Sequence, residues 1–241
     1  EFTKEFNVKV IAKQATVKVT TFTFDKTLDS NVKGQTGLLN GDRIHAAGGN
    51  EAYTSGIVKD ADGKLGSAFR FDGSTGIELP KNIIDSDVYT VSMWLKPESL
   101  THFTSLFFGA TSPSSWVSFA PATGHDDISD TALLWSGEQW YMGGTNVSLP
   151  LNAWSLVSFS NDQGTLKVYI DGVEVFKGEG FPNIFGTDLD SFFGLGVNYW
   201  DVPFKGSVDD LRIYPDSVWS AKDIKAYYDD VLNVRSPEQI A

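Results

Sequence analysis

The sequence predicts an all-β fold, an antiparallel β-sandwich, and three observations support this. Short runs alternate apolar and polar residues, as in Val17 to Phe24 and Val88 to Pro97, which is the period of a half-buried strand. Turn signals separate these runs; Asp171-Gly172, for example, supplies the positive φ angles of a tight hairpin. Only residues 220–229 have helical spacing. Many short strands, turns between them and one helix are typical of two packed sheets.

Composition narrows the classes of partner. The chain has 241 residues, with 31 acidic and 19 basic side chains and a net charge of −12. This acidic balance argues against nucleic acid, which is bound through a basic surface, and suits neutral ligands or Ca²⁺. Cysteine is absent, which excludes disulfides, zinc–cysteine sites and a thiol nucleophile. No apolar run is long enough to insert into a membrane.

The pattern of the first sixteen residues predicts a strand, which we assign to a preceding domain. Phe6, Val8 and Val10 alternate with polar residues, and the chain begins in polar, charged sequence without a signal peptide. We therefore expect an excised piece of a longer protein, with residues 1–16 the trailing strand or linker of a preceding domain. They are weakly similar to the closing strand of bacterial immunoglobulin-like modules. Alternatively, they form the first strand of the main domain.

The main domain is expected over residues 17–230, and residues 231–241 are expected to be a departing linker. Residues 30–63 predict a long loop region with one short strand, and residues 98–153 predict the least regular stretch, rich in aromatic residues. Ser220 and Asp223 form a capping box at the start of the single helix. The other predicted strands are 88–97, 154–160, 166–170, 173–176, 192–197 and 204–214, and residues 63–80 are expected to form a strand, a turn and a short second strand.

The last predicted strand contains an acidic residue in an apolar setting. Its alternation predicts one face with Asp209, Leu211 and Ile213, and the other with Val208, Asp210, Arg212 and Tyr214. A carboxylate in line with an apolar stripe must be neutralised, hydrogen-bonded or bound to a cation. An alternative is an Asp at a strand end that reaches solvent or backbone amides.

Three motifs resemble one family. They are Phe204-Lys-Gly-Ser-Val-Asp-Asp-Leu-Arg-Ile-Tyr214, the Gly-x-x-Gly-x-Ala-Phe-x-Phe-x-Gly run from Gly63 to Gly73, and the Trp154…Tyr169-x-Asp-Gly172 segment. Together they are similar to bacterial laminin-G-like domains of the concanavalin A-like lectin/glucanase superfamily, of the kind appended to secreted glycoside hydrolases. The resemblance covers roughly residues 17–230 and implies a jelly roll with one short C-terminal helix. It also implies an extracellular or bacterial cell-surface location.

The resemblance further implies a structural calcium ion. Asp25, which ends the Phe-x-Phe-Asp strand, and Asp209 match the family's calcium ligands, with backbone carbonyls completing the shell. Asp29 and Asp72 are the alternates.

Catalytic motifs are missing from the sequence. Catalytic relatives carry Glu-x-Asp-x-x-Glu or Glu-x-Asp-x-Glu on one strand, and this chain has no such string. The nearest acidic clusters are Asp126 to Asp130 and Asp209-Asp210. The three histidines do not neighbour a nucleophile elbow. We therefore expect a module without catalytic activity of its own.

Exposed aromatic residues beside polar ones favour a carbohydrate-binding module for plant or host oligo- or polysaccharide. The loop Asn198-Tyr199-Trp200-Asp201 combines a stacking surface with hydrogen-bonding groups, and loops held by rigid strands carry binding sites. We expect Trp200 to be the platform, and Trp140 or Trp135 the opposing wall. The other candidates are Trp116, His125 and Asp126. Trp94, Trp154 and Trp219 are assigned to structure; any of the remaining tryptophans could instead cover the sheet.

A second hypothesis is an adhesion or spacer domain of a cell-surface protein, which binds protein or host glycan or positions neighbouring domains of the same chain. An open groove lined by aromatic residues would favour polysaccharide, whereas a flat acidic face would favour protein.

Overall fold

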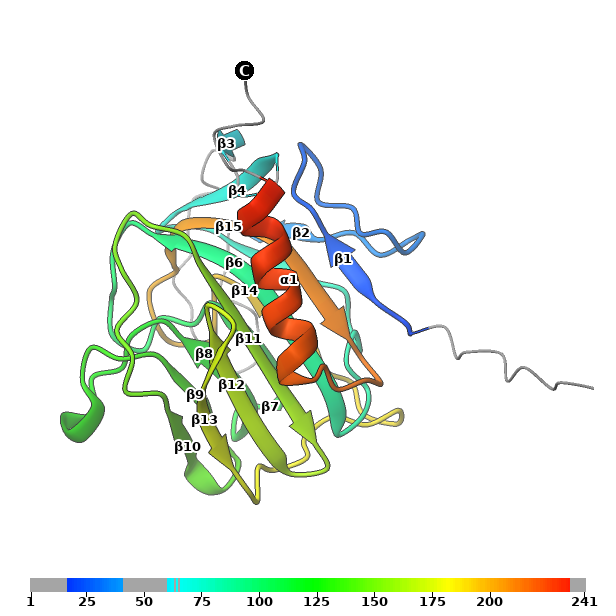
Figure 1. Cartoon of the computed structure of the whole chain (residues 1–241). Coiled ribbons are helices and arrows are strands. Elements are labelled where there is room, and N and C mark those ends of the chain that lie inside the picture. Colours follow the sequence, from blue (N-terminus) through cyan, green and yellow to red (C-terminus); the bar gives the residue numbers. More distant parts are fainter. Residues whose placement is uncertain (1–16, 41–59, 63, 65, 235–241) are drawn as a thin grey trace, which may run out of the picture.

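The computed structural model describes residues 17–40, 60–62, 64 and 66–234. Two antiparallel sheets pack face to face, and one helix lies across the outer face of the larger sheet (Figure 1). The predicted β-sandwich is confirmed. The alternating strand expected around Phe6 to Val10 lies outside the described residues, as does most of the long loop region before residue 63.

The larger sheet, in the described part of the chain, has eight strands. β15 (Lys205–Tyr214) is central: one edge pairs with β6, and the other edge is shared by β4 in its first half and β1 in its second. The remaining order is continuous and antiparallel. Its other strands are β13 (Val173–Gly178), β12 (Thr165–Ile170), β11 (Ser155–Asp162), β6 (Val88–Pro97), β4 (Ser67–Asp72), β3 (Asp60–Asp62) and β1 (Thr20–Phe22).

The second sheet has seven described strands, and four of them come from the stretch predicted to be least regular. Its order is β10 (Tyr141–Gly144), β9 (Leu133–Ser136), β8 (Ser115–Ala120), β7 (Phe107–Ser112), β14 (Phe192–Leu195), β5 (Gly76–Leu79) and β2 (Leu38–Asn40). Strands β7, β8 and β9 are buried on both faces, so the alternation that reveals a strand is weak in their sequence. Short 3₁₀ turns, η1 (Asp126–Ile128) and η2 (Glu138–Trp140), occupy the connections.

The main core lies between the two sheets and is rich in phenylalanine. Phe107 and Phe119 from the smaller sheet both contact Phe159 from the larger one, with ring centroids 5.6 and 6.2 Å apart. All three rings are fully buried. Removing a ring of this size from such a core costs about 3–5 kcal/mol of folding free energy. The core therefore provides a rigid support for groups on the outer faces.

Strand β15 contains a bulge, and its side chains therefore divide between the two faces differently from the predicted alternation. The register with β6 shifts between Asp209 and Arg212, and Asp210 has a φ angle of 46°. Val208 therefore joins Leu211 and Ile213 in the core. Asp209 pairs with Trp94, whose ring packs beneath the helix, so the expectation that Asp209 shares a face with Leu211 and Ile213 is wrong. Its carboxylate is nevertheless fully buried.

The helix α1 (Ala221–Val234) begins at the predicted capping box and continues past the expected end at residue 229. The hydroxyl and backbone N–H of Ser220 both donate to the carboxylate of Asp223. Below the helix, the Tyr227 hydroxyl donates to the buried Asp210, whose carboxylate also accepts from Arg212 Nε at 2.9 Å. The bulge therefore provides the anchor that holds the helix on the sheet.

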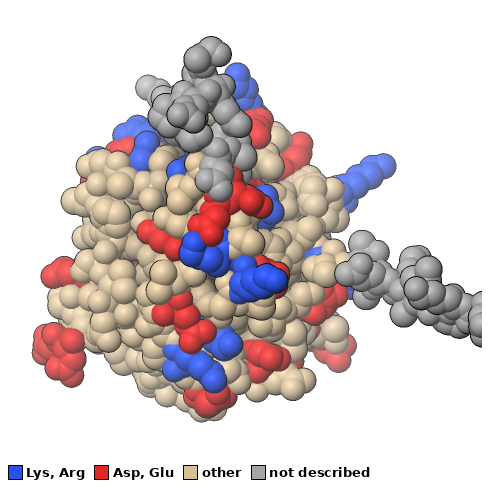
Figure 2. All heavy atoms as spheres, viewed as in Figure 1, with Lys and Arg blue, Asp and Glu red and all other residues tan. Residues whose placement is uncertain are grey.

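The face with the helix is polar and mixed in charge. Figure 2 shows acidic and basic side chains interspersed over α1 and the strands beside it; Lys225 and Asp229 of the helix, for example, form an ion pair. This view has no basic patch of the kind that binds nucleic acid. Within the described ranges, no helix has both the length and the apolar character needed to cross a bilayer.

Candidate functional site

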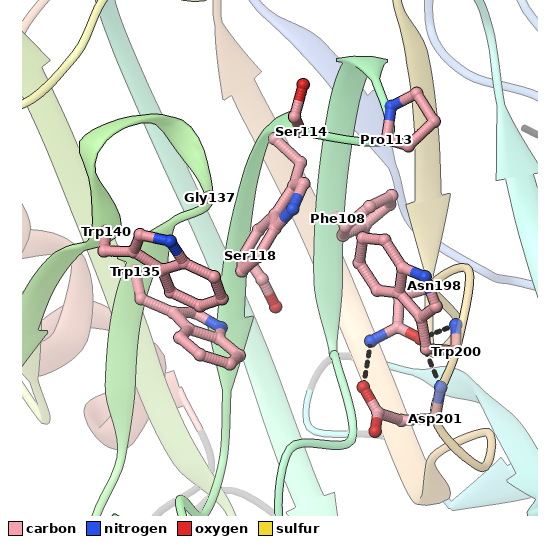
Figure 3. A pocket seen from close by; sticks show the side chains of 11 residues that line it. Phe108, Pro113, Ser114, Ser118, Trp135, Gly137, Trp140, Asn198, Trp200 and Asp201 are labelled. Atoms are coloured by element: carbon pink, nitrogen blue, oxygen red, sulfur yellow. Dashed lines mark hydrogen bonds between the residues drawn. The ribbon is translucent and has the colours of Figure 1, made fainter. Parts of the chain in front are cut away.

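The outer face of the seven-stranded sheet, opposite the core, carries a pocket lined mainly by aromatic side chains (Figure 3). Its volume is about 400 Å³, which is in the range of small-molecule sites. Strands β7, β8 and β9 form its floor, and the loops around residues 113, 140 and 200 form its walls. The lining residues are Phe108, Pro113, Ser114, Trp116, Ser118, Trp135, Gly137, Trp140, Asn198, Trp200 and Asp201.

Trp116 lies at the centre of this group. Its ring centroid is 5.6 Å from that of Trp200 on one side and 6.4 Å from that of Trp140 on the other. Trp135 contacts it edge-on at 4.9 Å. Trp116 is 6% exposed, whereas Trp140 is 69% and Trp200 is 38% exposed. A buried indole is thus flanked by two exposed ones.

The register of the sheet places the floor residues in a row. Phe108 of β7 pairs with Ser118 of β8, Ser118 pairs with Trp135 of β9, and Trp135 pairs with Met142 of β10. Side chains at paired positions point to the same face. Ser118 is the small residue between two large aromatic ones, and it therefore leaves a depression in the floor.

The local backbone holds Trp140 in an unusual conformation. Gln139 and Trp140 have φ angles of 57° and 51°, in the left-handed region that bulky residues rarely adopt. Such strain costs of order 1–3 kcal/mol per residue and is found at ligand clamps. Nearby, a Cβ atom on Gly137 would overlap the indole nitrogen of Trp116, so this position requires glycine although its φ is an ordinary −66°.

Asn198 builds the loop that presents Trp200. Its Oδ1 accepts the backbone N–H groups of Trp200 and Asp201 at 2.9 and 2.7 Å. Its Nδ2 donates to Ser105 Oγ at 2.9 Å and to Asp201 Oδ2 at 2.7 Å. An amide side chain offers two donors and one acceptor oxygen with two lone pairs, so all of its bonds are used within the protein. Asn198 lines the pocket but serves to position the loop.

Tyr199 is buried and does not line the pocket. Its ring packs edge-on against Phe108 at 4.8 Å, and burial raises the pKa of its hydroxyl to about 12. In the folded loop, successive residues point in opposite directions, so that Trp200 is exposed while Tyr199 joins the apolar cluster beneath it. The expectation that Tyr199 presents a ligand-binding surface is not supported by this placement.

His125 and Asp126 are not part of the pocket lining. The His125 ring packs edge-on against Trp135 at 5.4 Å and against Phe103 at 5.3 Å, so it supports the wall from behind. Asp126 is exposed in η1. The structure therefore brings together six of the predicted residues, which are Trp116, Trp135, Trp140, Asn198, Trp200 and Asp201.

Five lining residues were not predicted from the sequence as part of a binding site, namely Phe108, Pro113, Ser114, Ser118 and Gly137. The alternation in Ser115-Trp-Val-Ser-Phe-Ala120 contained a usable signal, because it places Trp116 and Ser118 on one face and Val117 and Phe119 on the other. Which of the two faces is the core follows only from the packing of the second sheet.

The pocket lining carries little charge. Of the described residues that line it, Asp201 alone is charged. A neutral ligand with apolar faces and hydroxyl groups matches such a lining better than a strongly charged ligand does.

The predicted calcium ligands lie elsewhere, on the larger sheet. Asp25 is exposed after β1, and its Oδ1 accepts the backbone N–H of Ser67 at 2.9 Å. Asp209 is buried beside Trp94. In the residues that the structure describes, no group of three or more His, Cys, Asp or Glu side chains is arranged to hold a metal. Two carboxylates with backbone carbonyls would still suit Ca²⁺, and the ion stays a proposal.

Comparison with known proteins identifies related domains. A family model described as Laminin_G_3, concanavalin A-like lectin/glucanases superfamily, matches residues 71–225. Among solved structures, domain 4 of AbnA, a GH43 extracellular arabinanase from Geobacillus stearothermophilus solved in complex with arabinotriose, is 38% identical. The TM-score is 0.77, and the match covers 86% of this chain and 96% of that one.

Other structural matches are more distant. The binding domain of botulinum neurotoxin serotype C1 is 14% identical with a TM-score of 0.60, over 88% of this chain and 51% of that one. The binding domain of botulinum neurotoxin DC, solved in complex with SialylT, is 13% identical with a TM-score of 0.55, over 88% and 51%. At this level of identity the matches indicate a shared fold alone. No curated protein sequence matches the chain.

Proposed function

The chain belongs to the concanavalin A-like lectin/glucanases superfamily, in its Laminin_G_3 family, and from this we propose that it is a carbohydrate-binding module of a secreted glycoside hydrolase. One observation carries the proposal. Two exposed indoles, Trp140 and Trp200, flank the buried Trp116 across a pocket on a rigid sheet. Most of the Trp140 side chain and more than a third of the Trp200 side chain are exposed and can contact a ligand.

The chemistry of the pocket suits a sugar. Pyranose and furanose rings have apolar C–H faces that stack on indole rings, and hydroxyl edges that require hydrogen bonds. Trp140 and Trp200 would provide the stacking surfaces, and the carboxylate of Asp201 at the rim would accept hydroxyl protons. Because Asn198 holds the loop in place before any ligand arrives, little ordering entropy is lost on binding.

Neutral arabino-oligosaccharides are the proposed ligands. The support is the 38% identity, over nearly the whole length of both chains, with an arabinanase domain solved with arabinotriose. The lining, in which Asp201 is the one charged residue among those described, agrees with a neutral ligand. By the same likeness, we propose that the module accompanies a catalytic domain of a longer extracellular protein.

The module is proposed to have no hydrolytic activity of its own. A glycosidase needs two carboxyl groups on either side of the scissile bond, about 5 Å apart in retaining enzymes and further apart in inverting ones. The described lining of the pocket contains one carboxylate, that of Asp201. Under this proposal, hydrolysis belongs to a separate catalytic domain of a longer protein.

Titration calorimetry with arabinotriose and with soluble arabinan tests the proposal. The wild type should bind both, and a variant with Trp140→Ala and Trp200→Ala should bind neither. Trp154→Ala is a matched control, because that indole lies against Lys96 and the helix-side cluster, on the opposite face of the sandwich. Absence of binding by the wild type to these sugars and to a wider glycan array would contradict the proposal and favour an adhesion or spacer role.

A further inference from the structure

One buried polar group, Ser118, interrupts the aromatic floor of the pocket. It lies between Phe108 and Trp135 in the row of paired residues, and it is 1% exposed. Figure 3 shows Ser118 on its strand with Trp135 on the strand beside it. A hydroxyl buried in an apolar surface must have its hydrogen bonds satisfied, or its desolvation is not compensated.

Ser118 ends a chain of hydrogen bonds that begins at the rim. Asp201 Oδ2 accepts from Asn198 Nδ2 at 2.7 Å, and Ser105 Oγ accepts from the same nitrogen at 2.9 Å. Ser105 Oγ lies 2.6 Å from Ser118 Oγ. This series of hydrogen bonds thus connects the carboxylate of Asp201 to the hydroxyl of Ser118. The two side chains between them, those of Asn198 and Ser105, are themselves buried.

The number of protons on each group fixes which atom donates in each of these hydrogen bonds. The Asn198 oxygen accepts two backbone N–H groups, which identifies the amide nitrogen as the atom facing Ser105. Ser105 therefore accepts a proton from Asn198. Among the described residues, its own proton has one acceptor, Ser118 Oγ. With the opposite order, the proton of Ser105 would be buried without an acceptor, which is costly.

If Ser105 donates to Ser118, the Ser118 proton has no acceptor among the described residues. Its acceptor must then come from the pocket. A second donor lies next to it: the Trp135 indole N–H, at the paired position on β9, is buried and has no acceptor in the described structure. Trp135 as a whole is 9% exposed. Two neighbouring buried donors without acceptors at the floor indicate the place of an acceptor from outside the chain.

We propose that Ser118 is a specificity-determining residue that donates its hydroxyl proton to an oxygen atom of the bound sugar, with the Trp135 N–H as its neighbour donor. This inference rests on the proposed function. The pocket then recognises two different oxygen atoms of one sugar unit, one as an acceptor and one as a donor. An acceptor oxygen lies on the floor at Ser118, and a hydroxyl that donates lies at the rim toward Asp201. Ser105 and Asn198 are the positioning residues that set the direction.

Two measurements on the protein test the inference. The first is calorimetry with arabinotriose on Ser118→Ala. Its matched control is Ser158→Ala, because Ser92 and Ser158 form an equally buried hydroxyl pair, 2.8 Å apart, in the larger sheet away from the pocket. The second is a neutron crystal structure of the unliganded, deuterated protein, which locates the hydroxyl deuterium atoms of Ser105 and Ser118 without any sugar.

We expect Ser118→Ala to weaken arabinotriose binding at least tenfold, equivalent to about 1.4 kcal/mol, and Ser158→Ala to leave it unchanged at a similar cost in melting temperature. In the neutron structure, the Ser105 deuterium should lie toward Ser118 and the Ser118 deuterium toward the pocket. Unchanged affinity of Ser118→Ala, or a Ser118 deuterium directed at Ser105, overturns the inference. Failure of the wild type to bind any sugar contradicts the proposed function instead, and the neutron result still decides the direction of the chain.

Discussion

The indole rings of Trp116 and Trp200 lie 5.6 Å apart, one fixed on strand β8 and the other on the loop that leads into β15. Their planes are tilted by 60°, so the buried ring supports the side of the exposed one. Trp116 is itself held by its strand on a sheet whose other face is the phenylalanine core. The exposed indole is therefore supported by packing against neighbouring rings before a ligand arrives.

Removal of the two exposed indoles should separate binding from stability. Trp140→Ala should change the free energy of unfolding by less than about 0.5 kcal/mol, because most of the side chain is in solvent. Trp200→Ala should cost about 1–2 kcal/mol, since part of its ring packs on Tyr199 and Phe108. Each should reduce affinity for arabinotriose at least tenfold. Urea unfolding and calorimetry on the same samples check this, and an unfolding cost near that of a core aromatic would instead assign Trp200 to structure.

Gly137→Ala should damage the pocket through shape alone. The new methyl group would overlap the Trp116 indole and displace it, although the backbone φ of −66° accepts alanine. We expect at least tenfold weaker binding and a changed tryptophan emission spectrum. Gly186→Ala is the control, because its Cβ would make only ordinary contacts with Leu189, the nearest at 3.6 Å. Equal affinity of the two variants would count against a fixed position for Trp116.

Calcium should raise the melting temperature if Asp25 and Asp209 bind it. An ion present at 100 times its dissociation constant stabilises the native state by about 2.7 kcal/mol. Asp25→Asn should abolish the calcium-dependent shift, and Asp188→Asn, a change in an exposed loop, should keep it. Scanning calorimetry with calcium and with chelator, together with elemental analysis, decides the matter. A melting temperature unmoved by chelator, with no metal found, would argue against the site.

Stability should fall at alkaline pH because of buried tyrosines. Burial raises the pKa of Tyr199 and of Tyr169 to about 12 in the folded protein, and an ordinary tyrosine titrates near 10. Below pH 10 both states keep the proton and these groups add no slope. Between about pH 10 and 12 the unfolded chain binds fewer protons, so the free energy of unfolding decreases as pH rises.

Tyr199→Phe should lessen this decrease, because phenylalanine has no proton to lose. Thermal melts of the wild type and the variant between about pH 8 and 11.5 measure the difference, which should be on the order of 1–2 kcal/mol at the alkaline end. Parallel curves for the two proteins would mean that Tyr199 ionises in the folded loop at its ordinary pKa.

Several features of the fold were readable from local sequence. Alternation over Val88 to Pro97 identified β6, Asp171-Gly172 identified the turn between β12 and β13, and Ser220 with Asp223 located the start of α1. The same is true of Trp200, a large aromatic residue in a connection that also contains Asn198 and Asp201. These signals depend on residues close together in the chain, so the sequence alone carries them.

Other features depend on contacts between distant segments. The bulge at Asp210 reversed the expected face of Asp209, because pairing with β6 and the bonds to Tyr227 and Arg212 outweigh simple alternation. Tyr199 and His125 were predicted as ligand-binding residues, and packing placed one in the outer-face apolar cluster and the other behind Trp135.

By itself, then, the sequence determined the class of fold, the family, and a set of tryptophans that are candidates for binding. Only the tertiary structure decided which of them meet. Trp116, Trp135 and Trp140 come together with Trp200 because β7, β8 and β9 pair in one register, and because the loop held by Asn198 folds over that sheet. The period of a strand states that two faces exist, but the choice of the buried face is made by the opposing sheet, whose residues lie far away in the chain.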